Sequence, residues 1–335
     1  MAVTFNPDDT SRFDKFTILT TPYKTVHGHD ITLDVLYPKE FKPGPDGQPI
    51  FIRYHGGGFT TGASLFPDLF GRWLLELAER YSAIVVSPDY RLIPEANSND
   101  VLEDVEDSWQ WVQTKLASFL EAKTGGKVRP DTSRIATAGE SAGGYLSLIL
   151  SLSHADRIRA TTAAYPMIDM KHPWFSEAYE KHLFDVPQLP KSIYLEHIES
   201  IKAQEGVADN DGQLKKVVVS SDPKFERGQL MFAFIQHGLY PAYFDNSSSK
   251  AYPLERVEAG ERFPKGGVFV WHGSEDSVVP IEQSRSLAKK VKELQPDAKF
   301  LLTEQPGDHG FDGEAKIDDD WLRYGLNPLV EAWLA

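Results

Sequence analysis

The chain has 335 residues, enough for one large α/β domain or for such a domain with a lid. Its formal net charge of −14 repels phosphate backbones and anionic lipid, which argues against nucleic acid or a membrane surface as partners. The chain contains no cysteine, so disulfides, zinc–thiolate sites and thiol nucleophiles are excluded.

Short β-rich runs alternate with helical patterns through the first half of the chain. Strands are predicted at residues 17–19, 31–37, 50–54, 83–86, 135–138 and 160–165. Apolar residues spaced three and four apart predict helices over residues 70–77, 101–120 and 145–152. This alternation is typical of a mostly parallel sheet covered by helices on both faces.

The alternation stops near residue 169 and resumes near residue 264. The intervening segment is irregular and aromatic, with helices predicted over residues 192–204 and 227–237. Beyond it we predict strands at residues 268–271 and 299–302 and helices at residues 287–294 and 322–333. We therefore divide the chain into an α/β core, residues 1–168 and 264–335, and a largely helical insertion, residues 169–263. Such an insertion is well placed to form a lid over the carboxyl ends of the strands, where open α/β sheets bind ligands; the alternative is an insertion with no part in the site.

The most informative motif is Gly139-Glu140-Ser141-Ala142-Gly143, which fits G-x-S-x-G between a predicted strand and a predicted helix. A sharp turn from strand to helix leaves Ser141 in a strained conformation and brings the residues on either side together, so Gly139 and Gly143 need to be glycine. The turn presents the Ser141 hydroxyl as a candidate nucleophile.

A second glycine motif, His55-Gly56-Gly57-Gly58-Phe59, follows an earlier strand. Attack on an ester creates an oxyanion that needs fixed N–H donors about 3 Å away. Gly57 and Gly58 are the candidate donors, with Ala142 as the third. The spacing matches neither a G-x-x-x-x-G-K nor a G-x-G-x-x-G phosphate loop.

Ser141 requires a base, and in this architecture the chain order is serine, acid, histidine. Asp276 follows the strand at residues 268–271, and His309 follows the strand at residues 299–302. We assign His309 as the base and Asp276 as the carboxylate that orients it. Glu275 and Asp308 are the nearest rivals for the acid role.

These motifs together resemble the hormone-sensitive-lipase-like carboxylesterases of the α/β-hydrolase superfamily, especially fungal members. The resemblance covers residues 30–334 apart from the insertion, and residues 89–95 (Asp-Tyr-Arg-Leu-Ile-Pro-Glu) are similar to that branch's D-Y-R-L-A-P-E segment. It departs at Glu140, where the branch usually has aspartate, and at Ser277-Val278-Val279-Pro280, where it often has D-P-L. The resemblance implies the α/β-hydrolase fold with a lid, esterase activity without cofactor or metal, a triad of Ser141, Asp276 and His309, and an oxyanion hole of Gly57, Gly58 and Ala142.

The expected substrate is a carboxylic ester of small to medium size, or an aromatic, polyketide-like one. Five residues are candidates for the substrate pocket: Phe59, Leu92, Glu140, Trp174 and Phe232. The alternative is a lyase, a cyclase or a lactone hydrolase that uses the same pocket in a secondary-metabolite pathway. A non-catalytic ligand receptor on this fold typically lacks the triad histidine, whereas this chain retains His309.

The first residues of the chain have neither the basic region nor the apolar run of a signal peptide, and no run approaches the roughly 20 apolar residues of a membrane helix. We therefore expect a cytoplasmic protein without stable membrane association. Its expected partner is a small-molecule ester, and a homodimer is compatible with the sequence.

Overall fold

A mixed eight-stranded sheet forms the centre of the molecule, in the order β1-β2-β4-β3-β5-β6-β7-β8. The structure, a computed structural model, describes residues 5–42, 44, 47–207 and 215–335. β1 pairs with β2 and β2 with β4 in antiparallel fashion, and every later pair is parallel. The strands are β1 (Phe16–Val26), β2 (His29–Pro38), β3 (Gln48–Tyr54), β4 (Ile84–Pro88), β5 (Pro130–Gly139), β6 (Ile158–Ala164), β7 (Val268–Gly273) and β8 (Phe300–Gln305).

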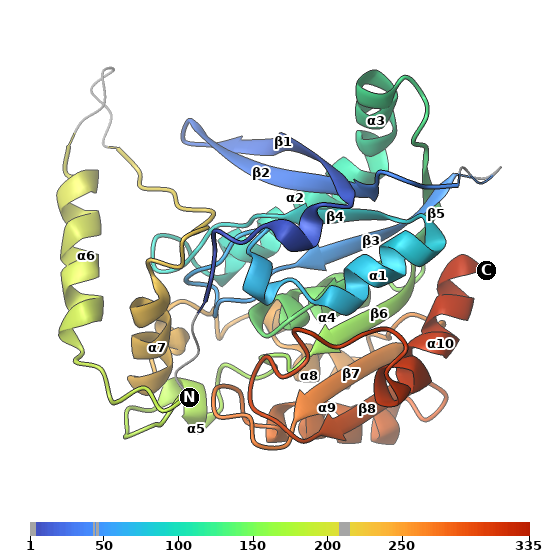
Figure 1. Cartoon of the computed structure of the whole chain (residues 1–335). Coiled ribbons are helices and arrows are strands. Elements are labelled where there is room, and N and C mark those ends of the chain that lie inside the picture. The colour runs from blue at the N-terminus through green and yellow to red at the C-terminus, as the bar shows by residue number, and fades with distance from the viewer. Residues whose placement is uncertain (1–4, 43, 45–46, 208–214) are drawn as a thin grey trace.

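Helices cover both faces of this sheet (Figure 1). The α-helices are α1 (Arg72–Tyr81), α2 (Ser98–Thr114), α3 (Leu116–Thr124), α4 (Ala142–Ser153), α5 (Pro173–Ser176), α6 (Ser192–Glu205), α7 (Gly228–Gln236), α8 (Pro253–Glu258), α9 (Glu282–Leu294) and α10 (Asp320–Leu334). Short 3-10 turns are η1 (Ser11–Phe13), η2 (Pro67–Leu69), η3 (Tyr240–Ala242) and η4 (Ser249–Ala251). Within the described residues, none of the helices combines the length and apolar character needed to cross a membrane.

The strand residues alternate between two separate hydrophobic cores. In β3, Ile50 and Ile52 face the core shared with α2, α3 and α4, whereas Phe51 faces the core shared with α1 and α10. Since successive side chains of a strand point to opposite faces, a sheet buried on both faces reads as a nearly continuous apolar run. The predicted mostly parallel, doubly covered sheet is therefore confirmed.

Two elements differ from the sequence expectation. β1 and β2 are longer than predicted, because they form a hairpin whose turn has positive φ at His27 (49°) and Gly28 (77°). The single helix predicted over residues 101–120 is two helices, which part at Lys115. The apolar stripe continues across the break through Leu116 and Leu120, so periodicity alone could not reveal it.

The insertion contains α5 to α8, and Figure 1 shows α5, α6 and α7 beyond the ends to which the parallel strands point. The predicted helices at residues 192–204 and 227–237 correspond to α6 and α7. The last part of the insertion packs differently: Val257 and Phe263 are buried in a core with residues of α4, β7 and α9. The segment that faces the strand ends is thus the earlier part of the insertion.

Candidate active site

Ser141 occupies the turn between β5 and α4, with φ 56° and ψ −116°. A non-glycine residue rarely adopts positive φ, and the surroundings must hold it there. A Cβ on Gly139 would lie 2.2 Å from the carbonyl oxygen of Gly143, and one on Gly143 would lie 2.0 Å from the carbonyl oxygen of Tyr54. Both positions therefore require glycine: Gly139 because of the close approach anticipated from the motif, and Gly143 because of the neighbouring strand β3.

His309 and Asp276 meet beside this turn. The Nδ1–H of His309 donates to Oδ2 of Asp276 at 2.8 Å, while Oδ1 accepts from the backbone N–H groups of Val278 (2.9 Å) and Val279 (2.7 Å). Burial opposes ionisation of Asp276, but the charge of His309 and hydrogen bonds from His272 and His309 outweigh it. The pKa of Asp276 consequently lies well below its ordinary value, so the carboxylate is charged at neutral pH.

A second histidine supports the same carboxylate. His272 is fully buried, and its Nε2–H lies 3.1 Å from Oδ2 of Asp276 and 2.9 Å from the carbonyl oxygen of Val279. Its Nδ1 then accepts from the Ser284 hydroxyl at 2.7 Å. His272 therefore holds Asp276 in place without facing the cavity, and we did not single it out from the sequence.

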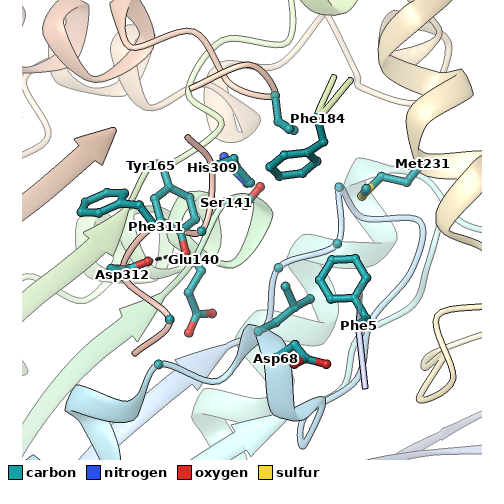
Figure 2. A pocket seen from close by; sticks show the side chains of 18 of the residues that line it. Phe5, Asp68, Glu140, Ser141, Tyr165, Phe184, Met231, His309, Phe311 and Asp312 are labelled. Carbon is teal, nitrogen blue, oxygen red and sulfur yellow. Dashed lines mark hydrogen bonds between the residues drawn. The ribbon is translucent and has the colours of Figure 1, made fainter. Parts of the chain in front are cut away.

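The hydroxyl of Ser141 and the imidazole of His309 face each other at the wall of one cavity (Figure 2). Within the described part of the chain, no hydrogen bond of 3.5 Å or less joins the two groups. Contacts of this kind are often long in an empty enzyme and tighten once substrate is bound. The structure thus brings Ser141, His309 and Asp276 into series, with the serine–histidine contact still open.

In the glycine loop, residues 55–59, hydrogen bonds to the carbonyl groups fix the direction in which the amide N–H groups point. The carbonyl oxygen of Gly56 accepts from Nδ1 of His55 (2.7 Å), and that of Gly57 accepts from the backbone of Thr60 (3.0 Å) and Thr61 (3.1 Å). In a trans peptide the next N–H points opposite to its carbonyl. The N–H groups of Gly57 and Gly58 are therefore directed away from these partners, and both residues line the cavity.

Ala142 and His55 complete this region. Ala142 is the first residue of α4, and its N–H is among those that have no partner within the helix. His55 is fully buried and stacked on Tyr90 with ring centroids 4.3 Å apart. Burial lowers the pKa of His55 to about 3, so this histidine is neutral and supports the loop as a hydrogen-bond donor.

The two rival acids bind elsewhere. Glu275 accepts from the hydroxyl of Ser274 and the backbone of Gly307. Asp308 accepts from the backbone of Ser277 (2.7 Å) and from its hydroxyl (2.9 Å), and also from the backbone N–H of His309. These carboxylates brace the loops that carry Asp276 and His309.

The cavity has a volume of about 330 Å³ and a mostly aromatic and apolar wall. Residues that the sequence interpretation did not single out supply much of this wall: Phe5, Tyr165, Phe184, Phe225, Met231 and Phe311. Tyr165 directly follows the end of β6, and Phe311 lies two residues after the triad histidine, so their chain positions carried a signal. The other residues come from the chain start and the insertion, where no periodic pattern indicates which side chains turn inward.

Of the predicted pocket residues, only Glu140 lines the cavity. Phe59 and Leu92 are fully buried in the core, where the rings of Phe59 and Tyr145 lie 5.4 Å apart. Trp174 donates from Nε1 to the carbonyl oxygen of Val278 at 2.8 Å, and Phe232 packs against Phe184. The aromatic content of the insertion indicated the right segment but not the residues that reach the site.

Two buried carboxylates lie under the site. Glu140 forms two hydrogen bonds with Arg53, and burial, opposed by that guanidinium, raises the pKa of Glu140 to about 7. Asp312 accepts from the Tyr165 hydroxyl (2.8 Å) and from Trp271 Nε1 (2.7 Å), and burial raises its pKa. Through these two bonds, Asp312 holds the loop that carries His309 against the end of β6 and against β7. The ring centroids of Tyr165 and His309 lie 4.3 Å apart.

Comparison with known proteins agrees with this arrangement. A family model described as alpha/beta hydrolase fold matches residues 51–205. "Probable carboxylesterase M8" of Phoma sp. (strain ATCC 20986 / MF5453) is 27% identical over 330 residues, covering 96% of this chain and 98% of that protein. "Non-reducing polyketide synthase atr1" of Stereocaulon alpinum is 26% identical over 82% of this chain, which spans only 11% of that synthase.

Among solved structures, the Pyrobaculum calidifontis esterase superposes with a TM-score of 0.56 and 20% identity, over 96% of this chain and 88% of that one. At this identity the likeness establishes the fold alone. The resemblance drawn from the two glycine motifs is confirmed by the family match and by the full-length fungal relative. The chain has the α/β-hydrolase fold and is a carboxylesterase-like hydrolase.

Proposed function

We propose that this protein hydrolyses carboxylic esters through an acyl-enzyme formed on Ser141. The observation that carries the proposal is the series of Ser141, His309 and Asp276 at one cavity, with the His309–Asp276 contact at 2.8 Å. Gly57 and Gly58 lie in the same wall as candidate donors to the oxyanion. Among the described residues that line this cavity, no other set of side chains combines a nucleophile with an oriented base.

In the first half-reaction, Oγ of Ser141 attacks the ester carbonyl while its proton passes to Nε2 of His309. The carbonyl electron pair moves onto oxygen, where the amides of Gly57, Gly58 and Ala142 would stabilise the oxyanion. Collapse of this intermediate breaks the bond to the alcohol oxygen, which takes the proton from His309. The products are a free alcohol and an ester of Ser141.

In the second half-reaction, a water molecule loses its proton to His309 and attacks the acyl-enzyme. Collapse of the second tetrahedral intermediate breaks the bond to Oγ of Ser141, which recovers the proton from His309. The carboxylic acid leaves and the enzyme is restored. Asp276 stays charged throughout and stabilises the imidazolium that forms twice in each cycle.

The proposed substrates are small to medium esters, with aromatic or polyketide-like acyl groups favoured. Support comes from the cavity wall, in which Phe184, Phe225 and Met231 of the insertion face Ser141 and His309. We further propose that residues 169–263 act as the lid that shapes this cavity. The likeness to a polyketide synthase supports a second candidate activity, hydrolysis of a lactone or a rearrangement of a polyketide at the same site.

A series of p-nitrophenyl esters tests the proposal, with acyl chains from acetyl to decanoyl and with benzoyl. We expect turnover of at least one member and its loss in the Ser141→Ala variant. Aryl lactones tested alongside measure the second candidate. Absence of turnover for every ester by a folded protein would contradict the proposed hydrolysis.

A further inference from the structure

His309 lines two spaces. One is the aromatic cavity that contains Ser141, and the other is a more open hollow of about 600 Å³ that shares residues 309–311 with it. Phe184, His309, Gly310 and Phe311 line both spaces, whereas His182, Asp185, Ser277 and Asp308 line only the hollow. A group at His309 can therefore be reached from the enclosed cavity and from the outer hollow.

Phe184 forms the partition between the two spaces. Its ring lies beside the imidazole, with centroids 6.2 Å apart at an interplanar angle of 61° (Figure 2). Its backbone N–H donates to the Ser277 hydroxyl at 3.0 Å, and that hydroxyl donates to Asp308. The partition is thus attached to the loops that carry the acid and the base.

The backbone at this partition is strained. Phe184 and Asp185 both have positive φ, 50° and 60°, and the Val186 N–H donates to the carbonyl oxygen of Leu183 at 2.8 Å. Two positive φ values at the centre of a closed four-residue turn are the pattern that favours Asn-Gly. Phenylalanine is costly at such a position, and a costly backbone conformation of this kind points to a role for the ring that lies there.

The reaction chemistry indicates which half of the ester each of the two spaces would receive. His309 must deliver a proton to the departing oxygen, so the alcohol half of the ester lies on the side of the imidazole. The acyl carbonyl must lie against Ser141 and the glycine amides, which belong to the enclosed cavity. Among the residues that line the hollow, Asp185 and Asp308 supply negative charge, and no lysine or arginine is present.

We propose, on the basis of the hydrolysis proposed above, that the hollow is the leaving-group subsite and that Phe184 is its gate. The alcohol half of the ester passes beside Phe184 into the hollow, and the acyl half stays in the aromatic cavity. A neutral or cationic alcohol fits this subsite, and an anionic one is disfavoured by the two carboxylates. Asp185, which is exposed and has no polar partner within the described residues, is the charge that discriminates.

Butanoyl esters of four alcohols test the proposal: ethanol, 3,3-dimethylbutanol, choline and glycolic acid. 3,3-Dimethylbutanol matches choline in size but carries no charge. Opening the gate with Phe184→Asn should raise kcat/KM for the dimethylbutyl ester relative to the ethyl ester by about tenfold, and Phe184→Trp should lower that ratio. Asp185→Asn should lower the ratio of choline to dimethylbutyl ester by about threefold and raise the ratio of glycolate to dimethylbutyl ester.

The matched control is His27→Asn, which relieves the same kind of turn strain in the exposed hairpin between β1 and β2. It should leave the three ratios among the four esters as in the wild type. If the wild type turns over none of the four butanoyl esters and none of the p-nitrophenyl esters, hydrolysis itself fails. If the ethyl ester is hydrolysed but the Phe184 and Asp185 variants leave the ratios unchanged, only the leaving-group subsite is overturned. Should Phe184→Asn not fold, Phe184→Trp and Asp185→Asn decide the outcome.

Discussion

The loops at the strand ends and the wall supplied by the insertion are built in different ways. Around Ser141, His309 and Gly57, backbone hydrogen bonds and steric contacts fix the chain closely, as illustrated by Gly143, where an added Cβ would lie 2.0 Å from the carbonyl oxygen of Tyr54. The insertion is held by side-chain packing, and it is uneven: α7 buries most of its residues, whereas no residue of α6 is fully buried. The first region suits a conserved reaction geometry, and the second suits variable substrate contacts.

The largest expected effect on kcat is that of replacing the nucleophile, which lies in the strand-end region. In Ser141→Ala, kcat should fall by at least about 10⁴-fold, because no covalent intermediate can form. The Ser141 hydroxyl makes no hydrogen bond within the described residues, so thermal stability should stay close to that of the wild type. Steady-state kinetics and a thermal melt check both parts. Residual activity above one percent would contradict the assignment.

The next largest effect is expected at the acid. Asp276→Asn should lower kcat by about 10⁴-fold, because the amide can no longer hold His309 in the tautomer that accepts the serine proton. Glu275→Gln is the matched control, since Glu275 is exposed and, within the described residues, its carboxylate forms hydrogen bonds only with Ser274 and Gly307. Equal losses in both variants would indicate that the loop, rather than the carboxylate of Asp276, is responsible.

The sequence indicated the strand-end region well and the insertion poorly. Glycine motifs predict sharp turns because a missing Cβ has a local steric meaning, and the order of serine, acid and histidine follows from the order of the strands. Phe184, Met231 and Phe5 instead reach the cavity through packing between distant segments, for which the sequence holds no periodic signal. His272 and Asp312 escaped notice because a buried polar residue shows its role only through its partners.

A steric test separates the rigid turn from an open loop. Gly143→Ala should destabilise folding by more than about 3 kcal/mol, because the new Cβ would meet the carbonyl oxygen of Tyr54. Gly310→Ala is the comparison, because Gly310 has a positive φ of 80°, unlike Gly143, but has open space around its Cβ position. It should cost only about 1–2 kcal/mol. Urea unfolding of both variants provides the measurement, and similar costs would argue against the steric explanation.

A change in the insertion should alter selectivity more than rate. Met231 lines the cavity, and its Cγ would lie 2.8 Å from a Cβ on Gly58. Met231→Ala enlarges the acyl space, so the ratio of kcat/KM for decanoyl to that for acetyl esters should rise by about tenfold. The kcat of the best substrate should change by less than about threefold. An equal loss of kcat/KM for all acyl chain lengths would indicate that Met231 supports the reaction geometry, as the strand-end loops do, rather than acyl selectivity.

The smallest expected effect concerns acid stability. The folded-state pKa of Asp276 is lowered, so its charge stabilises the folded protein above the ordinary value of about 3.8, and this contribution is lost as pH falls through the lower folded-state value. The gap in unfolding free energy between the wild type and Asp276→Asn should therefore be constant from pH 7 to 5 and narrow below pH 4. A gap that widens on acidification would contradict the sign of this shift.

The most direct test of the central claim is to identify the residue that carries the acyl group. The protein would be treated with an alkyl p-nitrophenyl phosphonate, digested and mapped by mass spectrometry. We expect one phosphonyl group per chain, located on Ser141, with activity lost in proportion to labelling and no labelling of Ser141→Ala. Labelling of another residue, or full activity in a protein labelled at Ser141, would contradict it.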